Sequence, residues 1–184
     1  MSSFTIQVDD AEVQAALARL AAAGQGLAPV LQAIGDDIME RAKRRFDTAT
    51  GPDGAPWRAN ARSTIEAFLR AKGGYGEKGL TKKGHINAKV QSWAMAKRPL
   101  QGHSGDLARQ FHVAVQGNSV TVGNSMRYAA MQQFGGKKSQ FAHLWGDIPA
   151  RPFLPVTVEE ELYPQERATI LETLNEYLAD ALKS

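Results

Sequence analysis

Residues 111–122 read FHVAVQGNSVTV, and this stretch decides the fold class. Two runs of alternating apolar residues flank the dipeptide Gly117-Asn118, which is a typical two-residue hairpin turn. In that register one face of the hairpin is apolar, so it needs a covering layer of other elements. The expected cross-strand pairs are Val115 with Val120 and Val113 with Val122.

Helical periodicity marks three segments outside the hairpin. A first helix follows Asp9, which resembles a capping box with Glu12, and Gly24 fits its C-terminal end. A second helix begins near Pro29, because proline suits the first turn of a helix. A last helix covers about 164–182. The apolar stripes of the second and last helices are Leu27, Leu31, Ile34, Ile38, Ala42 and Phe46, and Ile170, Leu171, Leu174, Tyr177, Leu178, Ala181 and Leu182.

Shorter elements complete the expected architecture. The segment 4–8 (FTIQV) alternates apolar and polar residues and predicts a half-buried strand. A short helix over about 128–134 takes its cap from Asn124 or Ser125, and the proline-containing segment after it is extended or turned. The whole chain, 1–184, is therefore expected to be a single α+β domain with helices packed on a small, mainly antiparallel sheet.

The charge is concentrated in one internal block. Residues 58–103 carry ten basic and two acidic side chains, net +8, whereas 1–57 carry −3 and 104–184 carry −2. This block also holds six glycines and few aliphatic residues, so it is hard to bury. We expect a long, flexible basic insertion arm with a short helix over 63–71. Its candidate contact residues are Arg70, Lys72, Lys78, Lys82, Lys83, Lys89, Lys97 and Arg98.

Such an arm has two candidate partners. It can contact an acidic neighbouring protein, or it can contact DNA phosphates without reading the base sequence. We favour the protein neighbour, because flexible segments order readily on a partner. Tyr75 and Trp93 offer stacking partners in this block, but two such rings are too few to form a stacking platform for single-stranded nucleic acid.

Several kinds of chemistry are not expected. The chain has no cysteine, and its four histidines are scattered, so no metal site is predicted. Gly74 to Gly79 matches GxGxxG by letter but follows no strand, and a flexible glycine linker fits it better than a nucleotide site. His103-Ser104-Gly105-Asp106 fits a helix-capping turn rather than a catalytic triad. No apolar run reaches the ~20 residues of a membrane span, and the N-terminus lacks signal-peptide character. We expect neither an enzyme nor a cofactor.

A series of short motifs stands in a specific order along nearly the whole chain, from about residue 4 to 182. The motifs are FDT at 46–48, GPDGAPW at 51–57, SGDL at 104–107, VG at 122–123, YAAMQQFGG at 128–136 and IPARPFL at 148–154. This series resembles the phage virion morphogenesis proteins of Mu-like phages and the related tail completion proteins of P2-like phages. The third motif departs from the commoner form, which has threonine before the glycine.

The resemblance implies a structural protein of the head–tail junction, made in the host cytoplasm and built into the virion. Such proteins form rings, often six-fold, that finish the tail or join it to the filled head, and they are not catalysts. The resemblance also implies an α+β sandwich. A head-side stopper or adaptor ring is the nearer alternative, and a basic nucleic-acid-binding module is an alternative of another class.

Some residues have two interpretations on this hypothesis. Trp57 either anchors its loop in the core, which we favour, or packs on a neighbouring subunit. Arg151 either pairs with a carboxylate across a subunit boundary or forms a pair within its own chain. Phe153 shares the interface hypothesis, although the core is favoured for it, as for Tyr128 and Phe134. The basic cluster 41–45 is interpreted as a solvated helix end.

Overall fold

The computed structural model describes residues 10–22, 26–102, 104–144 and 146–181. The strand expected over 4–8 and the helix end expected at Gly24 lie outside these residues. The helices are α1 (Ala11–Ala22), α2 (Leu27–Thr48), α3 (Arg62–Ala71), α4 (Ala88–Ala96), α5 (Asp106–Arg109), α6 (Ala129–Phe134) and α7 (Pro164–Ala181), with a 3₁₀ turn η1 (Glu77–Gly79). The strands are β1 (Phe111–Gln116) and β2 (Ser119–Asn124).

The hairpin forms in the register that the sequence predicts. Strands β1 and β2 pair antiparallel, with Val115 opposite Val120 and Val113 opposite Val122. Helices packed on a small antiparallel sheet confirm the α+β class. The proline-containing segment 148–153 is extended but adds no regular strand to this sheet.

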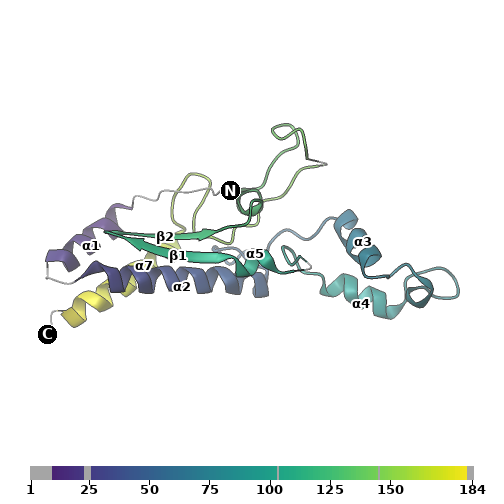
Figure 1. Cartoon of the computed structure of the whole chain (residues 1–184), viewed down its shortest axis with the longest axis horizontal. Helices are drawn as coiled ribbons and strands as arrows, with labels where there is room; N and C mark the ends of the chain where they lie inside the picture. The colour runs from purple at the N-terminus through teal and green to yellow at the C-terminus, as the bar shows by residue number, and fades with distance from the viewer. Residues whose placement is uncertain (1–9, 23–25, 103, 145, 182–184) are drawn as a thin grey trace.

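Helix α2 is the central element, and the hairpin packs along it (Figure 1). The close approach occurs at Gly35, where a Cβ atom would lie 2.5 Å from Cγ1 of Val113 and 2.7 Å from Cγ2 of Val120. Glycine is therefore required at position 35 because a side chain has no room there, and not because of the backbone conformation. Helices α1 and α7 pack against one another beside α2.

The core has two parts. One part joins α1, α2 and α7, and the valines of the hairpin pack against it. The other joins the end of α2 to the loop around Trp57 and to the segment 153–156. Phe46 is the centre of this second part, because its ring lies 5.3 Å from that of Trp57 and 5.4 Å from that of Phe153.

Two expectations about local structure need correction. The cap of α1 is Asp10, one position later than expected, and its Oδ1 accepts hydrogen bonds from the amides of Glu12 and Val13. Tyr128 was expected in the core but is 44% exposed, because it immediately precedes α6 and the helix does not turn it inward. Phe134, by contrast, packs partly buried against the second part of the core.

The basic cluster at the end of α2 is only partly solvated, so that interpretation was wrong for two of its members. Arg45 is 7% exposed, donates from Nη1 to the carbonyl oxygen of Phe153 at 2.7 Å, and pairs with Glu166 on α7. Arg41 lies 3.3 Å from the same carboxylate and 2.9 Å from Asp37. The end of the helix is thus fixed to the core by charge pairs made across the fold.

Gln133 on α6 organises the segment that follows it. Its side-chain oxygen accepts the backbone amides of Phe153 and Leu154, and its Nε2 donates to the carbonyl oxygens of Leu154 and Val156. The side chain is 1% exposed. One buried amide therefore replaces the strand partner that this extended segment lacks.

Candidate interaction surface of the insert

The basic block 58–103 leaves and rejoins the fold at the C-terminal end of α2 (Figure 1). Arg151 holds the departing chain, since its Nε donates to the carbonyl oxygen of Arg58 at 2.9 Å and its Nη2 to that of Ala59 at 3.1 Å. This is a contact within the chain, but its acceptors are backbone carbonyls and not the carboxylate that the sequence suggested. Burial, and then the charge of Arg58, lowers the pKa of Arg151.

The two aromatic candidates for a subunit interface are placed inside the chain's own core. Trp57 is 7% exposed and donates from Nε1 to the carbonyl oxygen of Pro152 at 2.9 Å. Phe153 is fully buried. Their placement agrees with the core interpretation of both rings.

Hydrogen bonds also fix the chain where it returns from the insert to the core. Asn60 donates from Nδ2 to the carbonyl oxygen of Lys97 at 3.1 Å, which closes the root of the insert. Arg98 donates to the carbonyl oxygen of Asp47, and Gln101 donates to that of Phe46 at 3.4 Å. The last carbonyls of a helix have no partner within the helix, so these side chains cap α2.

Two helices give the insert a small interior. The short helix expected over 63–71 is present as α3, while α4 was not predicted. Leu69 of α3 and Val90 of α4 are both buried, and Gly74 lies between them. A Cβ at Gly79 would lie 2.1 Å from the carbonyl oxygen of Gly74. These two glycines are close-packing positions, so the linker interpretation of the GxGxxG match was wrong.

Lysines lie over the aromatic rings of the insert. Lys72 Nζ is 4.8 Å from the ring centroid of Trp93 and 5.4 Å from that of Phe68. Lys89 lies over Trp93 at 5.5 Å, and Lys97 lies over Phe68 at 5.2 Å. Each such contact holds an ammonium group by the negative face of the ring. The rings thus keep three positive charges close together across α3 and α4.

The far end of the insert is a tight turn that carries lysines. Asn87 organises it: its Nδ2 donates to the carbonyl oxygen of Lys78 at 2.9 Å, and its Oδ1 caps α4 by accepting the amide of Val90. Leu80 bridges to Ile86 across the turn between them. The lysine side chains on this turn are exposed. These lysines, which we call the tip, are Lys78, Lys82 and Lys83.

The predicted contact residues therefore fall into two groups, one exposed along the insert and one that makes hydrogen bonds at its root. The tip lysines, together with Arg70, Lys72 and Lys89, are exposed along the insert. Lys97 and Arg98 instead belong to the root. Lys97 donates to the carbonyl oxygen of Gln101, and burial lowers its pKa.

A comparison with known protein families matches most of this chain. The model of the phage virion morphogenesis family matches residues 8–179, which include the core, the root and the insert. The chain belongs to the phage virion morphogenesis family. It thus has a role in the assembly of the phage virion, as the order of its motifs predicted.

One relative of this family member is the Mu-like prophage FluMu G protein 2 of Haemophilus influenzae. The two are 41% identical over 66 residues, which is 36% of this chain and 42% of the relative. The matched part therefore spans less than half of the relative's length. No solved structure matches the chain.

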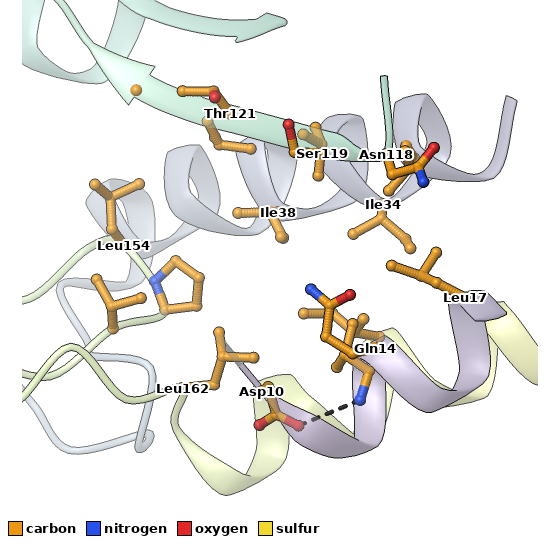
Figure 2. A pocket seen from close by; sticks show the side chains of 18 of the residues that line it. Asp10, Gln14, Leu17, Ile34, Ile38, Asn118, Ser119, Thr121, Leu154 and Leu162 are labelled. Atoms are coloured by element: carbon orange, nitrogen blue, oxygen red, sulfur yellow. Dashed lines mark hydrogen bonds between the residues drawn. The ribbon is translucent and has the colours of Figure 1, made fainter. Parts of the chain in front are cut away.

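The described residues of this family member contain no group of three or more metal-ligating side chains, and none of the described helices has the length and hydropathy to cross a membrane. The side-chain cap expected at Ser104 or Asp106 is not formed, because the N-cap of α5 is Gly105, which adopts a φ of 68° and has no side chain, while Ser104 donates its hydroxyl to the carboxylate of Asp106. An apolar groove beside β2 is lined by residues of α1, α2 and β2 (Figure 2).

Proposed function

We propose that the protein is a structural subunit of the head–tail junction, of the tail completion or tail terminator type. Copies of it form a ring, six-fold by the resemblance, which joins the finished tail to the filled head. The observation that carries this proposal is the family match over residues 8–179. The role is structural and not catalytic.

In this proposal the insert is the part that grips a neighbour. Its net charge of +8 and its exposed tip suit an acidic surface on an adjoining neck or tail-tube protein. The root hydrogen bonds fix where the insert leaves the core, so the tip is presented from a defined position. A head-side stopper ring would use the same surface toward the head.

The decisive experiment locates the chain in virions by electron microscopy. We expect a ring between the portal-side proteins and the tail tube, with the tip against a neighbour. In phage carrying Lys82→Glu with Lys83→Glu, we expect separated heads and tails. Lys137→Glu with Lys138→Glu reverses an equally exposed lysine pair outside the insert and is the matched control. Particles that lack the chain would refute the structural role.

The charge of the insert also supports one alternative, contact with DNA. The exposed basic residues of the insert could bind phosphates, singly or from several copies around a lumen. A titration of DNA affinity against salt separates the two cases. A steep fall of affinity with salt, lost in the Lys82→Glu, Lys83→Glu variant, would favour the nucleic-acid-binding module.

A further inference from the structure

Helices α3 and α4 form a surface of lysines and aromatic rings. Phe68 and Lys72 are four positions apart at the end of α3, and Lys89 and Trp93 are four positions apart on α4, so each pair shares one side of its helix. Nζ of Lys72 lies over both rings, which places the two pairs side by side. Both lysines are exposed and both rings are half-buried. We call these four residues the helical face of the insert.

The insert has few carboxylates of its own to balance this face. The block 58–103 holds two acidic residues, Glu66 and Glu77, against ten basic ones. Glu66 pairs with Arg62, at 2.7 Å. A surface with exposed ammonium groups and half-buried rings therefore suits a partner that offers carboxylates beside an apolar side chain.

The core offers that combination at residues 157–161, which read TVEEE and which we call the acidic turn. Its three glutamates are exposed, and Val158 is 64% exposed. Oγ1 of Thr157 accepts hydrogen bonds from the amides of Glu159 and Glu161, at 3.2 and 3.4 Å. The turn is thus held in one conformation by its own first residue.

The negative charge continues onto the neighbouring loop. Burial, and then the charges of Asp53 and Glu159, raise the pKa of Tyr163, although Arg45 opposes the shift. Both carboxylates therefore lie near the Tyr163 hydroxyl, and Asp53 is itself exposed. The acidic turn and Asp53 together place four carboxylates on this part of the core surface.

The helical face and the acidic turn lie on different parts of the molecule. The insert extends away from the core at one end (Figure 1), and the hydrogen bond from Asn60 to Lys97 fixes its root. The base of the acidic turn belongs to the core, because Val156 bridges to Leu162 and both pack in the second part of the core. Each surface is therefore presented to another molecule.

We propose that the helical face of one copy binds the acidic turn of a second copy. Lys72 and Lys89 pair with the glutamates of the turn, and Val158 packs against the two rings. The contact joins two different surfaces, so it is heterologous and repeats from copy to copy until a ring closes. This inference rests on the proposed function and names the contact that builds its ring, while the tip stays available to an adjoining neck or tail-tube protein.

A second copy is favoured over DNA by charge and by shape. The insert carries +8, whereas the flanking blocks 1–57 and 104–184 carry −3 and −2, so every copy brings both a basic and an acidic surface. The phosphates of duplex DNA would match the lysines, but they offer no apolar group to the rings of Phe68 and Trp93.

Charge reversal and its rescue test the contact in purified full-length protein. Lys72→Glu with Lys89→Glu makes the helical face negative, and Glu159→Lys with Glu161→Lys makes the acidic turn positive. Either double variant alone should weaken self-association by about tenfold or more, because like charges then meet. An equimolar mixture of the two variants should restore it, since each surface then meets one of opposite charge. Analytical ultracentrifugation measures all three samples.

Two matched controls reverse charge pairs elsewhere. Lys82→Glu with Lys83→Glu reverses the tip of the insert, and Glu172→Lys with Glu176→Lys reverses an exposed pair on α7. They change the net charge by the same amounts as the test variants. We expect self-association to stay near that of the wild-type protein in both.

Disulfide trapping gives an independent measurement, because the chain contains no cysteine. A Lys89→Cys variant mixed with a Glu160→Cys variant should form a disulfide-linked heterodimer under mild oxidation. The same Lys89→Cys variant mixed with Glu176→Cys should not.

Every other outcome overturns the contact. Such outcomes are wild-type protein that neither self-associates nor crosslinks, reversals without effect, a mixture without rescue, or equal crosslinking with Glu176→Cys. Loss of DNA binding in Lys72→Glu, Lys89→Glu with unchanged self-association would assign the helical face to nucleic acid instead. The proposed function fails separately, when virions lack the chain.

Discussion

Arg45 and Glu166 form a buried charge pair between α2 and α7. Burial lowers the pKa of Arg45, although the carboxylate of Glu166 opposes that shift. Arg41 adds a second positive charge at 3.3 Å from Glu166 Oε2, but without hydrogen-bond geometry. The carboxylate of Glu166 thus lies against two guanidinium groups that are wholly or partly removed from water, and Asp37 is a second partner of Arg41.

Removing Glu166 is therefore expected to be costly. Glu166→Ala leaves Arg45 buried without its charge partner and should lower the free energy of unfolding by about 3–5 kcal/mol. Denaturation by urea measures this. Glu172→Ala, at an exposed position on the same helix, should change it by less than about 0.5 kcal/mol. Equal effects of the two substitutions would contradict the proposed role of the pair.

Close packing at two glycines stabilises the insert, in addition to the contacts between its two helices. Gly79 and Gly74 touch backbone to backbone, and the turn from there leads to the Asn87 cap of α4. A side chain on Gly79 would force this contact apart. The element that presents the tip thus depends on two positions without side chains.

Gly79→Ala should loosen the start of α4 while leaving the core unchanged. Its Cβ would lie 2.1 Å from the oxygen of Gly74, whereas the Cβ of Gly76→Ala would meet the oxygen of Gly73 at an ordinary 3.4 Å. Hydrogen exchange is the measurement. We expect protection of the first α4 amides to fall at least tenfold in Gly79→Ala and to stay near wild type in Gly76→Ala. Unchanged protection in both would show that the turn can absorb the methyl group.

The molecule is elongated because the insert extends from one end of the core (Figure 1). Neither of the two core clusters in the described chain includes a residue from 61–96. The hydrogen bond from Asn60 to the carbonyl oxygen of Lys97 shows that the chain on either side of this segment is close in space. The core and the insert are thus joined mainly through the root.

Replacing residues 61–96 by a short glycine linker should therefore leave a folded core. We expect one cooperative thermal transition, shifted by no more than about 5 °C, because no cluster residue is removed. Circular dichroism follows the transition, and small-angle scattering should show a smaller radius of gyration. On the proposed function, this variant should also fail to complete phage particles. Loss of cooperative unfolding would show instead that the insert supports the core.

The sequence by itself determined the elements whose signals are local. The hairpin register follows from residues 111–122, and the apolar stripes of α2 and α7 follow from spacings of three and four residues. The order of short motifs also determined the family. These signals need only neighbours along the chain, because turns and amphipathic faces are properties of short segments.

Only the tertiary structure decided which distant groups meet. From the sequence, Arg45 is one of several basic residues interpreted as solvated. In the structure it pairs with Glu166 of α7, which lies 121 positions away along the chain. In the sequence, Gln133 is one polar residue of a predicted short helix. Its four hydrogen bonds form only because the tertiary structure places the segment 153–156 beside it. Helix α4 has weak amphipathicity and rests on contacts with α3, so periodicity did not reveal it. A buried polar group is satisfied by whatever the packing places beside it, and a local pattern carries no information about that partner.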